Sequence, residues 1–76
     1  EFPSNITNQQ NTDSFITQLT KDITISKNGT LTIKANHYLS TNNKEIINNG
    51  TLIIEGILDI NGGKIKNNGT IKIKKD

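Results

Sequence analysis

The second half of the chain alternates apolar and polar residues with a period of two, which is the pattern of β-strands rather than helices. From Leu52 to Gly62 every even position is apolar or glycine, and after Gly62-Gly63 the apolar residues move to odd positions. The alternation is interrupted by glycine and asparagine, which favour turns. The pattern therefore predicts short strands separated by tight corners.

One motif, I-x-[KN]-N-G-T-[LI]-x-I, occurs at residues 25–33, 46–54 and 65–73. Repeats spaced by about twenty residues indicate units that stack on one another, because one unit is too small to bury its own apolar face. A further short strand lies between successive copies, so each repeat supplies three strands and three corners. We predict an all-β fold, a short parallel β-helix or solenoid of about two to three coils over residues 23–76.

The register of this stacking follows from aligning the copies without gaps. The threonines of the three motifs would then lie above one another, and so would the asparagines before their glycines. The column Lys34, Glu55 and Lys74 would alternate in charge at the roughly 4.8 Å spacing of neighbouring strands. This alternation favours the proposed register.

Asn-Gly between apolar runs is also a signal for β-hairpins. A three-residue loop at Lys27-Asn28-Gly29 would pair Ile25 with Leu31, so antiparallel hairpins are an alternative. The short strand at Ile57–Ile60 and the nearly constant repeat length favour the solenoid.

Residues 56–73, with the pattern G-x-[LI]-x-I-x-G-G-x-I-x-N-N-G-T-[LI]-x-I, resemble the repeat of right-handed β-helix proteins. These include bacterial adhesin and autotransporter passengers and the trimeric fibre or spike proteins of viruses and phages. The likeness covers residues 23–73 and implies an architecture more than an activity, since such proteins range from scaffolds to polysaccharide lyases. The chain departs from them in having few coils and no cluster of acidic residues.

The first part of the chain follows a different pattern. Residues 1–11 are polar and rich in Asn and Gln, so we expect a flexible arm or a remnant of cloning. Within residues 12–22, Phe15, Ile16 and Leu19 share one face of a short helix, which would cap the open end of the solenoid. A strand pairing with Ile23–Ile25 is the alternative.

Composition limits the possible classes of protein. The 76 residues carry a formal charge of +2, and 14 Ile, 5 Leu and 2 Phe must form the core. The absence of cysteine excludes disulfides and thiolate metal sites. No apolar run reaches the roughly 18 residues of a membrane span, so we expect no membrane insertion. A chain this small without a disulfide or metal is commonly stabilised by oligomerisation.

Candidate catalytic groups are few. His37 has no acidic neighbour in sequence to orient it, and Glu45, Glu55 and Asp59 are isolated on outward positions. General acid–base chemistry needs paired, oriented groups. We therefore predict no enzyme, no cofactor and no metal site.

Outward-pointing isoleucines are the main candidate for a binding surface. Ile47, Ile53 and Ile57 face outward on the middle coil in the predicted register. Burying each side chain would contribute about 1.5–3 kcal/mol. We predict that they form an oligomer interface, most simply of a homotrimer, within a non-enzymatic structural module of a fibre, spike or adhesin.

Such a module would act outside the cell or on a virion surface. The least regular stretch, residues 35–43, contains Asn36, His37 and Tyr38, and we predict that this loop is presented to a surface or capsid partner.

The lysines support an alternative function. All basic residues are lysine, and several of them alternate with isoleucine near the C-terminus. They could track a phosphate backbone, so the alternative is a small nucleic-acid-binding protein. They could also protect an exposed strand edge from further pairing. These residues are Lys64, Lys66, Lys72, Lys74 and Lys75.

Overall fold

The protein consists of short β-strands. The computed structural model describes residues 2–74, which form eleven strands and no helix. The strands are β1 (Asn5–Ile6), β2 (Gln9–Asn11), β3 (Ile16–Gln18), β4 (Ile23–Ile25), β5 (Thr30–Ile33), β6 (Tyr38–Ser40), β7 (Glu45–Asn48), β8 (Thr51–Ile54), β9 (Ile57–Asp59), β10 (Lys64–Asn67) and β11 (Thr70–Ile73).

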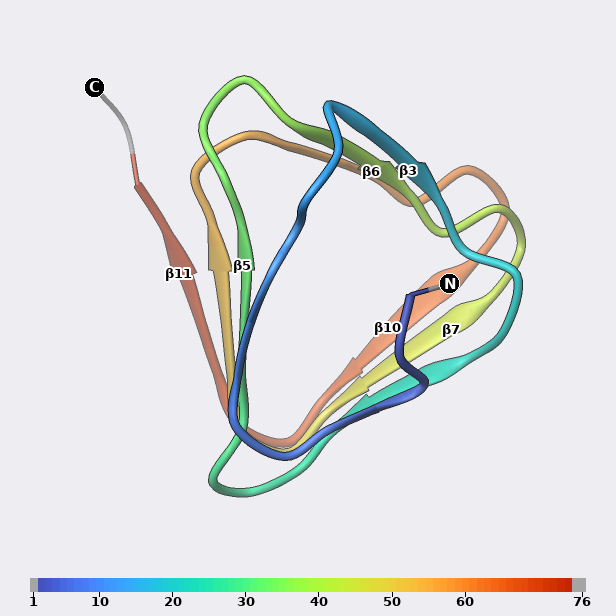
Figure 1. Cartoon of the computed structure of the whole chain (residues 1–76). Coiled ribbons are helices and arrows are strands. Elements are labelled where there is room, and N and C mark those ends of the chain that lie inside the picture. Colours follow the sequence, from blue (N-terminus) through green and yellow to red (C-terminus); the bar gives the residue numbers. More distant parts are fainter. Residues whose placement is uncertain (1, 75–76) are drawn as a thin grey trace.

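Three parallel sheets form the sides of a triangular coil (Figure 1). Sheet A contains β1, β4, β7 and β10, sheet B contains β2, β5, β8 and β11, and sheet C contains β3, β6 and β9. The strand pairs within residues 2–74 are all parallel. The hairpin alternative is therefore excluded, and the fold is an all-β parallel solenoid of about three coils. Strands β10 and β11 form its last, C-terminal coil.

The second and third motif copies stack in the predicted register, and the first does so from Thr30 onward, whereas Ile25 lies opposite Asn48 rather than Ile46. Thr30 lies opposite Thr51, and Thr51 lies opposite Thr70. In the charged column, Lys74 Nζ lies 3.6 Å from Glu55 Oε2. A surface ion pair of this kind contributes little to stability, but it confirms the alternation of charge.

Inward-pointing Leu and Ile side chains form one core along the solenoid axis. Successive members of a column, such as Leu31 and Leu52, lie opposite each other and are fully buried. The fully or almost fully buried apolar residues are Ile6, Leu19, Ile23, Ile25, Leu31, Ile33, Leu39, Ile46 and Leu52.

The Asn-Asn-Gly corners are held by side-chain amides and need glycine. The Asn48 amide is buried, donates to Asn67 Oδ1 at 2.8 Å and accepts from Gly50 N at 3.1 Å. A Cβ at Gly50 would overlap the carbonyl oxygen of Ser26. Left-handed backbone occurs at other corners, at Asn36, Asn42, Asn43, Asn61 and Gly62.

The predicted capping helix over residues 12–22 is wrong. Residues Ile16–Gln18 form β3, which pairs in parallel with β6 rather than with Ile23–Ile25. Of the three apolar residues assigned to the helix face, only Leu19 is buried, and Phe15 and Ile16 are exposed. Backbone pairing with β6 satisfies more peptide groups than one isolated helical turn could, because a short helix is costly to nucleate.

Residues 1–11, expected as an arm or a remnant of cloning, supply two strands of the first coil. Strands β1 and β2 pair with β4 and β5, and Ile6 enters the core. Main-chain hydrogen bonds do not depend on side-chain type, so a polar segment can complete a coil.

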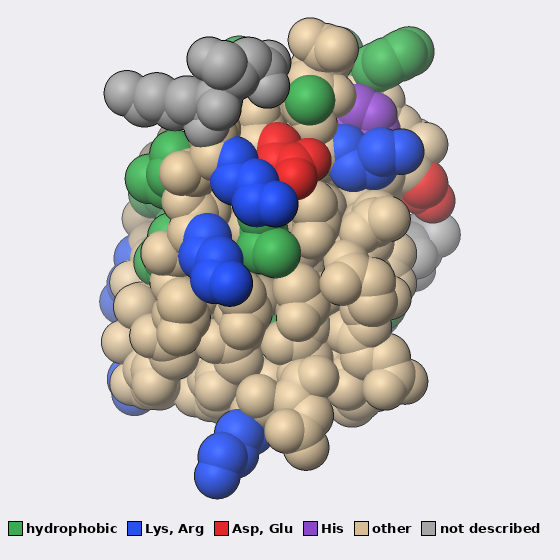
Figure 2. Space-filling model, turned by 90° about the vertical axis from the view of Figure 1, so that its left-hand side faces the viewer, with side chains coloured by type: hydrophobic (Ala, Val, Ile, Leu, Met, Phe, Trp, Pro, Cys, Tyr) green, Lys and Arg blue, Asp and Glu red, His purple; other side chains and the backbone are tan. Residues whose placement is uncertain are grey.

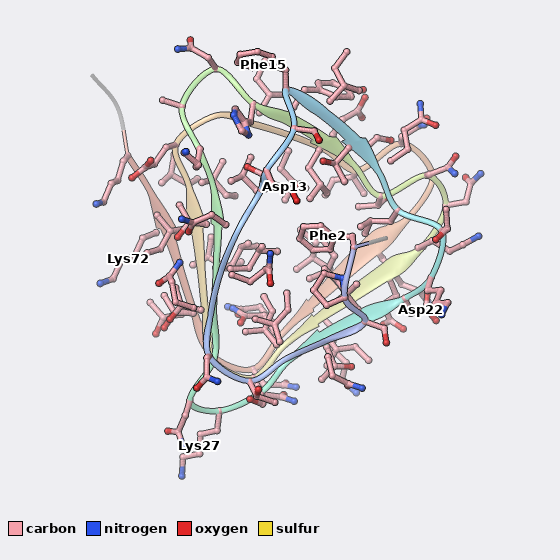
Figure 3. All side chains as sticks on the ribbon, viewed as in Figure 1. Phe2, Asp13, Phe15, Asp22, Lys27 and Lys72 are labelled. Atoms are coloured by element: carbon pink, nitrogen blue, oxygen red, sulfur yellow. The ribbon has the colours of Figure 1, made fainter. Side chains whose placement is uncertain are left out.

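The N-terminal end of the solenoid is polar and partly covered. Gln10 and Thr17 occupy the columns that Leu31 and Leu39 continue in the second coil. Phe2 packs against the core and lies within the outline of the triangle (Figure 3). The end that we expected a helix to cap is therefore partly covered by an aromatic side chain and has polar inward positions.

Candidate interaction surfaces

Large exposed apolar side chains gather in two places among the described residues. Phe15, Ile16 and Ile57 are 73%, 69% and 59% exposed and lie on or beside sheet C. The second group lies at the C-terminal end of the solenoid and comprises Ile60, Ile71 and Ile73.

The first surface is an apolar column on sheet C. Ile16 lies opposite Tyr38, and Tyr38 lies opposite Ile57. We call these three residues the sheet C column. Tyr38 is half-buried between its two exposed neighbours. Phe15 adjoins the column and points away from the triangle (Figure 3).

A polar column runs beside the sheet C column. It consists of Gln18, Ser40 and Asp59. Tyr38 Oη donates a hydrogen bond to Asp59 Oδ2, which ties the two columns together. This hydrogen bond raises the pKa of Tyr38, and desolvation and the charge of Asp59 act in the same direction.

The three isoleucines predicted as one interface lie on three different faces. Ile47 is on β7 in sheet A, Ile53 is on β8 in sheet B, and Ile57 is on β9 in sheet C. A flat partner surface can contact only one side of a triangular coil at a time. Only Ile57 belongs to an exposed apolar group.

The neighbours of these isoleucines were predicted in part. Ile53 is flanked by Thr32 and Lys72, as expected. Ile47 is flanked by Lys66 and by Thr24, whereas the alignment of the motif copies without gaps would place Ser26 opposite Ile47. The register of β4 differs by two residues because the corner between β4 and β5 spans residues 26–29, two residues more than the corresponding corner at residues 49–50 between β7 and β8.

The predicted loop at residues 35–43 presents less than was expected. Asn36 is exposed in a left-handed turn, but His37 is largely buried. His37 Nδ1 lies 2.7 Å from Thr12 Oγ1, and its ring makes an edge-to-face contact with Phe15 at 5.3 Å. His37 therefore ties the second coil to the first.

The lysines of the last coil are divided between two faces. Lys64 and Lys66 lie on β10 in sheet A, whereas Lys72 is on β11 in sheet B and Lys74 follows it. On the sheet B side, basic side chains lie next to acidic ones rather than in one continuous patch (Figure 2). Lys75 lies outside the described residues. Nucleic-acid binding stays a prediction, since no contact made by these lysines favours it.

The second surface is the C-terminal end of the solenoid. Strands β9, β10 and β11 are each the last strand of their sheet. The inward columns end there with Ile71 and Ile73 exposed, although Leu52 above Ile71 is fully buried. This end therefore shows unpaired strand edges around an open section of the core.

The described part of the chain lacks a metal-binding cluster and a membrane-spanning helix. Residues 2–74 contain no group of three His, Asp or Glu side chains that could hold a metal ion. They also contain no helix that could cross a membrane. A shallow depression at the N-terminal end is lined by Phe2, Pro3, Gln10, Asp13, Ser14, Ile16, Thr17 and Gln18.

Comparisons of the chain with protein-family models, curated proteins and solved structures found no match. The fold is therefore established by the structure, and the resemblance to adhesins and fibres stays a prediction.

The sequence reasoning missed Phe15 and Ile16 as surface residues. The polar residues that flank them, Ser14 and Thr17-Gln18, were the available signal. The signal was weak because a strand of three residues holds too few positions to distinguish period two from helical spacing.

Proposed function

We propose that this chain is a non-enzymatic structural module of a fibre-, spike- or adhesin-type protein, and that its copies associate as a homotrimer through sheet C. The sheet C column carries this proposal, because Ile16 and Ile57 are exposed on either side of Tyr38. Covering an exposed apolar stripe with a second apolar surface removes both from water, which makes the free energy of association more favourable.

The layout of sheet C supports three-fold association. The sheet C column lies next to the corner that carries Phe15, and the polar column with Gln18 and Asp59 lies farther from this corner. Three copies with parallel solenoid axes can bring their apolar columns together at a common axis. The polar columns then remain at the rim. Because the three-fold symmetry is closed, every chain makes the same contacts and no apolar column stays uncovered.

The position of the module in a larger assembly follows from this proposal. An oligomer of this kind belongs outside the cell or on a virion surface. The corner at Asn36 lies beside the common axis, whereas the exposed corner at Asn43, beyond the other end of β6, is farther from it and is free to contact a surface or capsid partner.

Light scattering on a sizing column tests the proposal with two matched variants. Ile57→Lys places a charge in the sheet C column, and Ile53→Lys places the same charge on sheet B of the same coil. We expect a mass of three chains for the unsubstituted protein and for Ile53→Lys. Ile57→Lys should dissociate to single chains, because a lysine cannot be desolvated cheaply at an apolar contact.

Two results would contradict the proposal. The first is a single-chain mass for the unsubstituted protein across the accessible concentration range. The second is dissociation by Ile53→Lys with no effect of Ile57→Lys, which would place the interface on sheet B.

A further inference from the structure

We infer that the C-terminal end of the solenoid is a docking surface for one further β-coil of the same repeat type, which carries carboxylates opposite Lys64 and Lys74. This inference goes beyond self-association through sheet C, because it uses a different surface and a different partner.

The strand edges at this end have backbone groups that can pair with further strands. Strands β9, β10 and β11 each pair with a preceding strand on one side only. Each edge therefore presents N–H and C=O groups to a further parallel strand. A single coil has three strands in the same order and can pair with all three edges at once.

The interior of this end needs an apolar partner. Ile65 and Ile71 continue columns in which Ile46 and Leu52 are fully buried, yet Ile71 is 36% exposed. Ile73 is 69% exposed, although Ile33 in the same column is fully buried. A coil with leucine or isoleucine at these inward positions would cover all three.

The asparagine ladder is open at its last member. Asn67 Oδ1 accepts from Asn48 Nδ2 at 2.8 Å and from Gly69 N at 3.2 Å. Its own amide nitrogen therefore faces the open end, and no group within residues 2–74 accepts from it. An asparagine at the same place in the added coil would accept this hydrogen bond, as Asn67 does for Asn48.

The charges at this end select the partner. On their N-terminal side, Lys64 lies opposite Glu45, and Lys74 lies 3.6 Å from Glu55. A coil added in the same register would meet both lysines from the other side. Opposite charges across neighbouring strands stabilise the pairing and like charges weaken it. The added coil should therefore carry acidic residues at these two positions.

A second copy of this chain fits the end poorly. Docking of two C-terminal ends would place the lysines of β10 and β11 against each other. Docking of an N-terminal end would place Gln10 and Thr17 at inward positions, with Phe2 already covering the core. The surface therefore favours a partner of different outer charge.

Residues 35–55 of this chain are a suitable probe, because they form one coil with Glu45 and Glu55 at the required positions. We would join a copy of this segment after Asp76 through a flexible glycine-serine linker, which raises its effective concentration without adding contacts. The matched control is the same appended segment with both glutamates replaced by lysine. Amide hydrogen exchange of β10 and β11 reports docking.

The acidic coil should slow exchange in β10 and β11 by roughly tenfold or more, and the lysine coil should not. Ile73→Lys should abolish the protection, and its exposed position leaves the remaining fold intact. Equal protection by both coils, or unchanged exchange with the acidic coil, would overturn the inference. A failure of the trimer proposal would be recognised separately. That proposal is tested by the solution mass of Ile57→Lys and not by amide exchange in β10 and β11.

Discussion

Asn48 is a buried polar residue in a column that begins with apolar side chains. Ile6 and Ile25 precede it in sheet A, and Asn67 follows it. Its amide also donates to the Thr70 carbonyl oxygen at 2.9 Å. The side chains of the column change from isoleucine to asparagine at the Asn-Asn-Gly corner, which needs side-chain hydrogen bonds. The buried amide of Asn48 is tolerated because it is hydrogen-bonded.

Replacement of Asn48 by alanine should therefore destabilise the fold. We expect a loss of about 1–3 kcal/mol in the free energy of unfolding, because Gly50 N and Thr70 O lose a buried partner. Urea denaturation measures this loss. Asn67→Ala is the control and should cost less, since Asn67 is exposed and water can replace its amide. Equal losses would show that burial of the amide is unimportant.

Tyr38 gives a prediction about pH. Its pKa is raised by the hydrogen bond to Asp59, so the neutral phenol is favoured in the folded state. Above the ordinary pKa of about 10, the unfolded chain releases this proton before the folded chain does. The contribution of Tyr38 to stability is therefore complete below this pH and is lost as the pH rises through the folded pKa.

Absorbance of tyrosinate can follow this titration, because the chain has one Tyr and no Trp. We expect the midpoint to lie above that of free tyrosine, and Asp59→Asn should move it downwards. The same substitution should make the loss of stability above about pH 10 less steep. A midpoint that does not change in Asp59→Asn would show that another group controls Tyr38.

At the scale of the strand, position along the axis decides how much a core residue contributes. Leu39 on β6 and Leu58 on β9 lie opposite each other in one inward column. Leu39 is fully buried between two coils, whereas Leu58 is half-buried on the last strand of its sheet. Identical side chains therefore have different surroundings.

Leu39→Ala should cost about 2–5 kcal/mol in the free energy of unfolding, because it leaves a cavity in the middle of the core. Leu58→Ala should cost clearly less, since solvent already reaches part of this side chain. Chemical denaturation of both variants provides the measurement. If Leu58→Ala were equally costly, the C-terminal end would be covered in solution, for instance by association of chains.

Strand β3 shows the limit of reading single elements from sequence. Phe15, Ile16 and Leu19 match helical spacing, yet the segment is a strand because β6 lies beside it and pairs with Thr17 and its neighbours. Strands with the Asn-Gly-Thr motif were predictable, because three copies confirm each other. A segment that carries no copy of the motif has no such confirmation, and the neighbour in space decides its conformation.

At the scale of the whole molecule, the two ends of the solenoid differ. The N-terminal end has polar inward residues and the Phe2 side chain over the core (Figure 3). The C-terminal end has exposed isoleucines and strand edges that are unpaired within residues 2–74. A solenoid has only nearest-neighbour interfaces, so each end must be covered in its own way. The fold thus offers one lateral surface, on sheet C, and one axial surface.

The sequence by itself determined the repeat and the strands of the motif, and it favoured their parallel stacking, with the threonine and charged columns, over antiparallel hairpins. These features follow from local alternation and from a period that recurs, both of which are visible without a structure. Only the tertiary structure decided that residues 2–22 complete a first coil, that His37 is buried, and that the three outward isoleucines lie on separate faces. The reason is physical: alternation distinguishes inward from outward side chains, but the angle of each corner determines which of three faces an outward side chain occupies.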